Sequence, residues 1–254
     1  MSTYLQVDFK TGTAFQYSGS HKEGFEEHTN SKGDVSYRKY FKKGVFGTLL
    51  NASVRDSKIG PQLQIALKVG DEYTYLQTSL HDQKGNIADF AESLIRFLPN
   101  LKKDTDYRFF PYVLTADNQR KYDVEQGKEP RKKYYDSRGF SVKLADLTTL
   151  TVTDKVEAAI GYNKPEENDA TKIPAIEWEP GATEGKMVPE PVSVAVKKKF
   201  LTAKLKEATE GHLKYEDNSS SSSSSTTAQT EPATATATSE SAPPAGDDHD
   251  DLPF

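Results

Sequence analysis

The sequence contains no cysteine, so it excludes disulfides, thiolate-bound metal ions and a thiol nucleophile. This composition fits a reducing compartment, and we expect a cytoplasmic protein. No apolar run approaches the roughly 18 residues that suggest a membrane-spanning helix. Residues 1–8 also lack the basic-then-apolar pattern of a secretory leader. The sequence therefore predicts neither secretion nor a membrane partner.

Motifs that would indicate catalysis are absent as well. The chain has no HExxH pair, no Walker phosphate loop and no nucleophile elbow centred on serine. Acidic pairs such as Glu26-Glu27 occur in polar stretches, where solvation explains them better than metal binding. The five histidines are scattered along the chain: His21, His28, His81, His212 and His249. We therefore expect no enzymatic activity, no metal ion and no cofactor.

Charge is divided unevenly along the chain, whose net charge is −5. Residues 216–254 hold eight acids and no Lys or Arg, whereas residues 1–215 hold 33 basic and 30 acidic side chains, a net charge of +3. An acidic tail on a basic body can fold back onto an empty basic groove. The alternative interpretation is that the acidic tail only keeps the protein soluble.

The tail has too little apolar surface to fold. A serine run, Ser219 to Ser225, is followed by Thr, Ala and Pro repeats, and no aliphatic or aromatic side chain larger than alanine occurs before Leu252. Burial in such a segment cannot offset the entropy lost on ordering. We therefore expect residues 216–254 to be a disordered linker that presents its tip on the order of 30 Å away.

The last residues form an acidic peptide with an aromatic end: Asp250, Asp251, Leu252, Pro253 and Phe254. The ring of Phe254 and the stiffness of Pro253 suit a partner's pocket, and the aspartates can meet Lys or Arg around it. This tip, behind a polar linker, resembles the C-terminal tip of single-stranded DNA-binding proteins of bacteria and their phages. His249, which interrupts the aspartate run, departs from that pattern and should weaken its charge.

The resemblance implies how such a protein would work. In that family an OB-fold body binds single strands, while the tip docks replication, recombination and repair proteins and competes with DNA for the basic groove. It thus implies partners of the polymerase, helicase, primase or nuclease class, and a host cytoplasm if the chain is phage-encoded. The resemblance covers only the tip and the overall layout.

The hydrophobic pattern divides the rest of the chain into three parts. Residues 1–35 are polar and glycine-rich, and we expect a loop-rich N-terminal arm with a short strand over 4–9. Residues 151–215 form an extension, in which an extended excursion up to 191 precedes an amphipathic helix over 194–213. That helix could cap the body, pair with a second copy in a homo-oligomer or contact DNA, and capping is favoured.

Residues 36–150 carry the pattern of the core. Strands are predicted over 37–54, bending at Gly44 or Gly47, and over 62–69 and 73–80. A helix should follow Asn86 as its N-cap and stop at Pro99, and strands should follow over 106–114 and within 132–144. Three strands, one helix and two strands is the order of an OB-fold. The predicted fold is therefore mainly β, an OB-fold-like five-stranded Greek-key barrel with one helix between strands 3 and 4.

Binding of single strands needs cations along the phosphate path and aromatic faces for the bases. Such residues recur in the first, third and fourth strands and in the connection from the fourth strand to the fifth. The candidates for single-stranded DNA are Tyr37, Arg38, Tyr40, Lys42, Tyr73, Tyr75, Tyr107, Phe109, Arg120, Lys121, Tyr122, Arg131, Lys132, Lys133 and Tyr135.

The alternation of side chains along a strand predicts which face some of these candidates occupy and leaves the face of others open. Leu76 and Leu80 fit the core face, which places Tyr73 and Tyr75 on the opposite face, exposed or covered by the helix or the excursion. In the fourth strand, residues 107 and 109 alternate with 110 and 112, and all four are aromatic. One pair should be core and the other exposed, and the sequence does not choose between them.

Three classes of function remain. The favoured one is a protein that binds and protects single-stranded DNA during replication, recombination or repair, without strong sequence preference, and recruits partners through its tip. The second is a protein-interaction adaptor that uses the tip to hook host replication proteins and binds no DNA itself. The third is an enzyme that acts on single strands, such as a nuclease.

Overall fold

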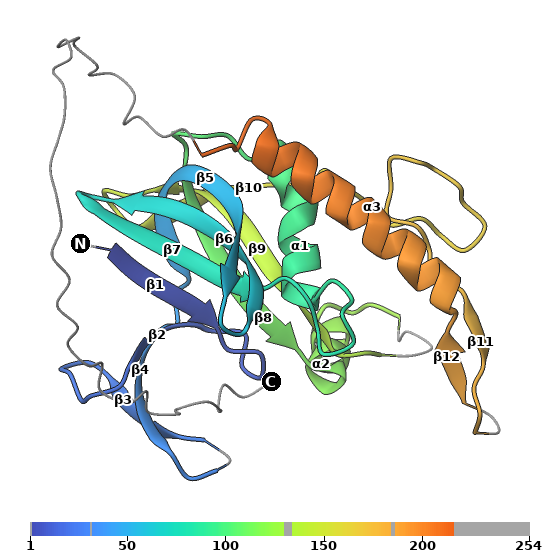
Figure 1. Cartoon of the computed structure of the whole chain (residues 1–254), viewed down its shortest axis with the longest axis horizontal. Coiled ribbons are helices and arrows are strands. Elements are labelled where there is room, and N and C mark those ends of the chain that lie inside the picture. Colours follow the sequence, from blue (N-terminus) through green and yellow to red (C-terminus); the bar gives the residue numbers. More distant parts are fainter. Residues whose placement is uncertain (1, 31, 130–133, 184–185, 216–254) are drawn as a thin grey trace, which may run out of the picture.

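The computed structural model describes residues 2–30, 32–129, 134–183 and 186–215 (Figure 1). These residues form one large mixed sheet, a separate two-stranded hairpin and three α-helices. The strands of the large sheet, in spatial order, are β10 (Thr151–Lys155), β9 (Ser137–Asp146), β8 (Asp106–Leu114), β5 (Val45–Ser57), β6 (Gly60–Val69), β7 (Glu72–Ser79), β1 (Ser2–Val7), β2 (Ala14–Ser18), β4 (Val35–Phe41) and β3 (Glu26–Thr29). The prediction of a mainly β fold is confirmed.

The sheet is not closed into a five-stranded barrel. Its described edges are β10 and β3, and neighbouring strands are antiparallel except for β1 and β7, which are parallel. Closure would bring β7 beside β9, but β1 pairs along β7 instead. Helix α1 (Asp89–Phe97) packs against β9, where the Ser93 hydroxyl accepts a hydrogen bond of 2.8 Å from the backbone N–H of Phe140. Strand β1 thus occupies the edge of β7, and β10 occupies the edge of β9, that barrel closure would join.

The segment predicted as one bent strand over 37–54 is two strands. The chain turns at Gly44, whose φ is 86° and whose N–H donates to the carbonyl of Phe41 at 2.9 Å. A Cβ at this glycine would lie 2.8 Å from the carbonyl oxygen of Phe109, so only glycine allows the strands this close an approach. After the turn β5 pairs with β6 and β8, whereas β4 lies at the other end of the sheet, between β2 and β3.

Residues 1–35 differ from the predicted loop-rich arm, because they supply β1, β2 and β3. Leu5 and Ala14 are fully buried and Phe15 is nearly so. Leu5 lies opposite Leu76 of β7 in the parallel ladder, so the N-terminal segment is part of the core sheet. Its polar composition concealed this, since few of its side chains face the core.

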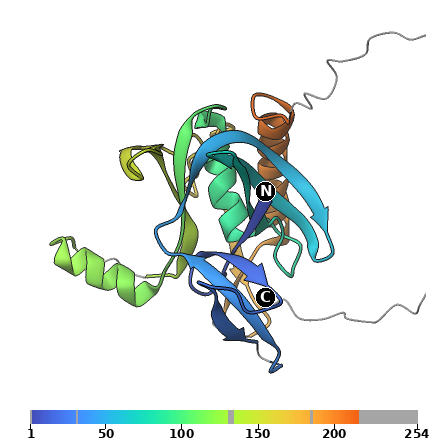
Figure 2. The same cartoon turned by 90° about the vertical axis from the view of Figure 1, so that its left-hand side faces the viewer.

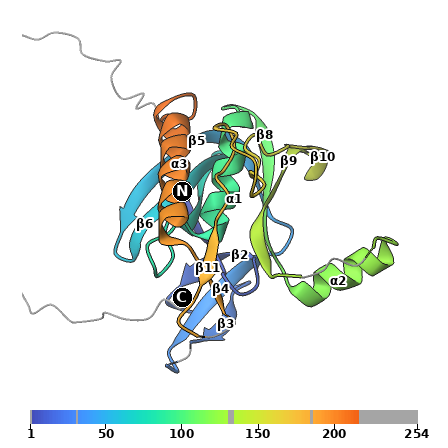
Figure 3. The same cartoon turned by 90° about the vertical axis from the view of Figure 1, so that its right-hand side faces the viewer.

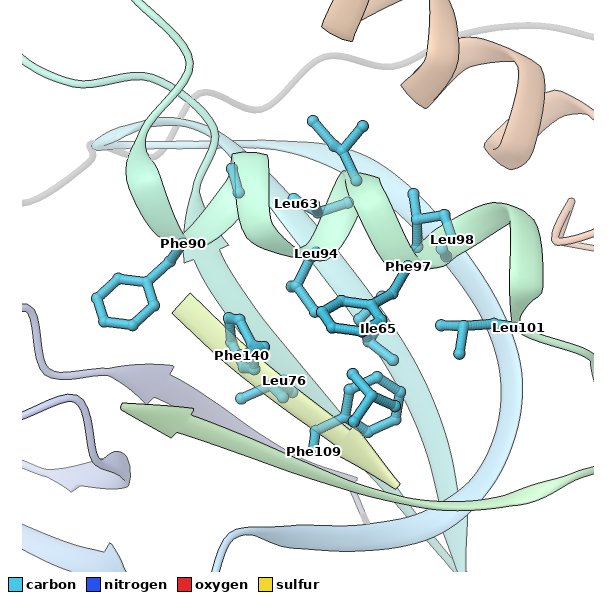
Figure 4. Close-up of a cluster of buried hydrophobic side chains, with 14 of the residues drawn as sticks. Leu63, Ile65, Leu76, Phe90, Leu94, Phe97, Leu98, Leu101, Phe109 and Phe140 are labelled. Atoms are coloured by element: carbon cyan, nitrogen blue, oxygen red, sulfur yellow. The ribbon is translucent and has the colours of Figure 1, made fainter. Parts of the chain in front are cut away.

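The core lies between the sheet and two helices. Leu63 and Ile65 of β6, Leu76 of β7 and Leu94 of α1 are fully buried and meet in Figure 4. The short 3-10 helix η1 (Leu98–Asn100) follows α1, so Pro99 comes after the α-helix as expected. Asn86 is not its N-cap, because the helix begins after Ala88 and Asn86 belongs to a turn closed by Asp82.

The C-terminal helix caps this core, as predicted. Helix α3 (Pro191–Glu210) lies beside α1 in Figure 1, and Leu201, Leu205 and the following Leu213 are buried in the core cluster. Lys197 of α3 and Glu92 of α1 form an ion pair of 2.8 Å. The hairpin β11 (Trp178–Pro180) and β12 (Met187–Pro189) precedes α3. None of the described helices is long and apolar enough to cross a membrane.

A helix that the sequence did not predict lies between β8 and β9. Helix α2 (Ala116–Glu125) projects away from the sheet in Figures 2 and 3. Thr115 caps it, since its side-chain oxygen accepts a hydrogen bond from the N–H of Asn118 at 3.2 Å. The segment has no apolar stripe, so its composition is typical of a charged loop.

Candidate nucleic-acid interface

Tyrosines lie on the outer face of the sheet, the face turned away from α1. Along β7, Thr74, Leu76 and Thr78 are buried, whereas Tyr73 is 45% exposed and Tyr75 is half-buried. The predicted alternation of this strand is therefore confirmed. We define the tyrosine face as Tyr4, Tyr73, Tyr75, Arg55 and Lys68.

Two of these rings form a stacked pair. Tyr4 lies opposite Tyr75 in the parallel β1–β7 ladder, and their ring centroids are 4.9 Å apart with an interplanar angle of 21°. Tyr4 is 55% exposed, so the pair ends in a free aromatic surface. Burial, and then the neighbouring phenols of Tyr4, Tyr215 and Tyr73, raise the pKa of Tyr75. Four tyrosines thus gather at one place on the sheet.

Sequence reasoning missed Tyr4 and Tyr215. Tyr4 reaches Tyr75 only through parallel pairing between strands about 70 residues apart, for which no local pattern exists. Tyr215 comes near because Leu213 is buried and its carbonyl accepts a hydrogen bond of 3.1 Å from Ala52 of β5. A lone tyrosine at the end of a polar segment gives no signal of such a contact.

Cations and neutral polar groups surround the rings. Lys68 lies opposite Tyr73 in the β6–β7 ladder and is exposed, and Arg55 is exposed at the end of β5. Gln77 donates to the side-chain oxygen of Gln64 at 2.9 Å on the same face. The hydroxyl of Ser53, opposite Gln64, is buried and has no hydrogen-bond partner in the described part of the chain. The face thus offers ring surfaces and positive charge, while Gln64 and the Ser53 hydroxyl beside them are buried.

The candidates on β4 do not join this face as a group. Arg38 is only 5% exposed, forms an ion pair of 3.3 Å with Asp8 and lies 4.4 Å from the centroid of the Phe15 ring. Its guanidinium therefore holds β1, β2 and β4 together instead of facing solvent, a correction to its predicted role. Tyr40 packs against Phe15 with centroids 6.0 Å apart.

Two further candidates, Tyr37 of β4 and Lys42 directly after this strand, lie in polar surroundings. The ring of Tyr37 lies edge-on to His21, with centroids 5.4 Å apart. Lys42 is exposed beside Glu26, with 3.9 Å between its Nζ and a carboxylate oxygen. An exposed pair at this distance is worth little, so Lys42 remains available to an anion.

Two candidates on β8 belong to the core, which corrects their predicted role. Tyr107 is 2% exposed and Phe109 fully buried, with ring centroids 6.0 Å apart. The Tyr107 hydroxyl accepts a hydrogen bond of 3.0 Å from the N–H of Lys102. Neither ring can stack on a base in this fold. The alternating residues Phe110 and Tyr112 take the outer face, which settles the choice that the sequence left open.

The fourth-to-fifth connection presents its candidates on the projecting helix. Arg120, Lys121 and Tyr122 of α2 are exposed, and Tyr135 after it is 68% exposed. Arg120 lies 5.3 Å from the ring centroid of Tyr134. Arg131, Lys132 and Lys133 lie outside the described residues, as does the predicted partner-binding tip, residues 250–254.

Comparison with known proteins adds no relative. No protein-family model matches this chain, and neither the curated proteins nor the solved structures contain a match. In the described ranges, no group of three or more His, Asp or Glu side chains is placed to hold a metal ion. The functional argument therefore rests on the tyrosine face and on the sequence of the tail.

Proposed function

We propose that this protein binds single-stranded DNA on its tyrosine face, without strong sequence preference, and recruits replication, recombination or repair proteins through its C-terminal tip. The observation that carries the proposal is the stacked pair of Tyr4 and Tyr75 beside the exposed ring of Tyr73. Every base has a π-face, so stacking on such rings is tolerant of sequence, and it contributes about 1–3 kcal/mol per base.

The strand order supports an OB-type origin for this body. Strand β5 pairs with both β6 and β8, β8 pairs with β9, and α1 comes between β7 and β8 in the chain. In OB-folds the face of the second and third strands binds oligonucleotides. The corresponding strands here are β6 and β7, which carry Lys68, Tyr73 and Tyr75. We propose that the extra strands were added to an OB-type arrangement.

The chemistry of the face favours DNA over protein as its ligand. A docking surface for protein usually has an apolar centre, whereas aliphatic side chains are few between these rings. The outward positions next to Tyr73 and Tyr75 on β6 and β7 are Lys68, Ala66 and Gln77. Amide and ammonium groups beside open rings suit phosphates and bases. An adaptor that binds only protein is the alternative that the experiment below separates.

The experiment that tests the proposal compares the full chain with a chain ending at Tyr215. Labelled oligo-dT is titrated with each and followed by fluorescence anisotropy. Because residues 216–254 carry eight acids and no Lys or Arg, their removal should leave the affinity equal or increase it. Weaker binding by the shortened chain would contradict competition between tail and DNA. Absence of binding by both chains would refute the proposal and favour the adaptor.

A second arm concerns the tip. Deletion of Leu252 to Phe254 alone should preserve binding to oligo-dT and abolish capture of purified replication proteins that recognise such tips. The proposal for the tip fails if the deleted chain still captures them equally well. The matched control is the full-length variant Thr226→Ser, which changes the linker and keeps the tip.

A further inference from the structure

A second cluster of cations and rings lies on the outer face of β8 and β9. Phe110 and Tyr112 occupy the positions that alternate with the buried rings of β8. Together with Arg108, Ser141 and Lys143 they line a shallow hollow of about 290 Å³. None of these residues belongs to the tyrosine face.

Three cations stand in one row across this surface. In the strand registers Arg108 of β8 lies opposite Lys143 of β9, and Lys143 lies opposite Lys155 of β10. Like charges in directly opposite positions destabilise a sheet. Lys155 has a partner in Glu157, at 3.2 Å, but Arg108 and Lys143 form no ion pair with a carboxylate in the described part of the chain. Such a row is relieved when an anion binds between the cations.

The guanidinium of Arg108 is held in a fixed position. Its Cζ lies 4.7 Å from the ring centroid of Phe110 and 5.8 Å from that of Phe46, which faces Arg108 in the β5–β8 register. Its Nε is buried and has no hydrogen-bond partner among the described residues. A guanidinium that is positioned by rings and has no carboxylate partner suits the planar recognition of a phosphate, through the nitrogens other than the buried Nε.

We propose that this hollow binds a nucleotide of the same single strand, with its phosphate held by Arg108 and Lys143 and its base against Phe110 or Tyr112. The inference rests on the proposed function and extends its site. Strands β6, β5 and β8 follow β7 in order, so Tyr73 and Arg108 are three strand spacings apart, roughly 14 Å. Both are on the outer face, so one strand of sufficient length can contact the two clusters.

The test measures how the effect of Lys143→Gln depends on strand length. This variant keeps most of the aliphatic stem and removes the charge. Each phosphate contact to a single strand contributes about 0.7 to the slope of log K against log salt, equivalent to about fivefold in affinity at 0.1 M salt. We therefore expect a loss of about fivefold for a strand of about 30 nucleotides, and little change for a dinucleotide bound at the tyrosine face, which is too short to reach the hollow roughly 14 Å away.

The matched control is Lys206→Gln. Lys206 is an exposed lysine of α3, which covers the opposite face of the sheet, and it pairs with Glu210 at 3.8 Å. Lys206→Gln should change the affinity and the salt slope only by the small amount expected from removing one positive charge anywhere on the protein. Arg108→Lys provides a second variant, which keeps the charge and removes the planar fork, so it should lower the affinity for the long strand and leave the salt slope unchanged.

The outcomes separate this inference from the proposed function. If Lys143→Gln leaves the long strand unaffected while Tyr73→Ala weakens both lengths, the hollow is not on the path of the strand and the proposed function stands. If the wild-type chain binds neither length, the inference falls together with the proposed function. A third arm titrates thymidine monophosphate: saturable binding that Lys143→Gln abolishes, without any effect on strands, would assign the hollow to a free nucleotide and overturn the inference.

Discussion

The exposed ring of Tyr73 provides the sharpest perturbation of the proposed DNA site. Its side chain is 45% exposed and lies opposite Lys68 at the start of β7, whereas the core side of the strand is formed by Leu76 and its neighbours. Replacement of Tyr73 by alanine therefore removes a ring surface without opening a cavity. The free energy of unfolding should change by no more than about 0.5–1 kcal/mol.

The effect on binding should be much larger. Loss of one base stack costs about 1–3 kcal/mol. At 25 °C this is a decrease of roughly 5-fold to 150-fold in affinity for oligo-dT. Tyr73→Phe keeps the ring and should stay within about twofold of wild type. Tyr75→Ala should lose binding and also about 0.5–1.5 kcal/mol of stability, because Tyr75 stacks on Tyr4 at 4.9 Å.

The assay is an anisotropy titration of labelled oligo-dT with each variant, with urea unfolding of the same preparations. Trp178→Ala is the matched control, because Trp178 is 59% exposed but belongs to the β11–β12 hairpin and not to the large sheet. The control should bind like wild type. Equal affinities of wild type and Tyr73→Ala, with both folded, would refute stacking at this position and assign the tyrosine a structural role.

Three further predictions concern residues that hold the fold. Arg38→Met should lower the free energy of unfolding by about 3 kcal/mol, because Asp8 loses its partner at a site where both side chains are nearly buried, and should leave DNA affinity unchanged; urea unfolding checks it, and a stable variant with weak DNA binding would return Arg38 to the DNA site. Phe109→Ala should cost about 3–5 kcal/mol, since the ring is fully buried; a loss below about 1 kcal/mol would contradict its place in the core. Burial, and then the charge of Lys198, lower the pKa of His81 from its ordinary 6.5, so the unfolded chain takes up the proton first and stability should fall as pH falls below 6.5. His81→Gln should make that decrease less steep in unfolding curves between neutral and acidic pH, and an unchanged slope would exclude this histidine as a cause.

Local patterns predicted those elements whose side chains alternate or repeat. The opposite parities of Tyr73 and Leu76 in β7 followed the period of two, and the structure confirms them. In β6, Leu63 and Ile65 are buried as predicted, but Gln62, Gln64 and Ala66, which alternate with them, are buried too. The helical spacing around Phe90 likewise gave α1, whose N-cap is Ala88, two residues after the predicted Asn86. These features depend only on which face of an element is apolar, and residues close together in the sequence determine that face.

Pairings between distant segments could not be predicted in this way. Gly44 gave the position of a bend but not its sharpness, which depends on the close approach of Phe109. The choice between the two aromatic pairs of β8 depends on which face meets α1, since both faces are equally apolar in sequence. The parallel pairing of β1 with β7 brings Tyr4 onto Tyr75, and composition in residues 1–35 contains no sign of it.

The arrangement of cations could be predicted only in part. The combination of tyrosine with Lys or Arg indicated several segments as equally good DNA-binding candidates. In the structure, however, Arg38 forms a buried ion pair, whereas Lys42 is exposed. Conversely, Arg108 and Lys143 are 35 residues apart and become neighbours only through the β8–β9 register. A charge in a sequence shows what a residue can bind, while its partner depends on which strands are adjacent.

The measurement that tests the central claim most directly is photo-crosslinking of the full chain to a single strand that contains 5-bromodeoxyuridine, with the crosslinked peptides identified by mass spectrometry. The account predicts crosslinks at Tyr4, Tyr73 or Tyr75, which unlabelled single strands suppress and duplex DNA suppresses far less. Crosslinks confined to α2 or to β2–β4, with none on the tyrosine face, would contradict the account.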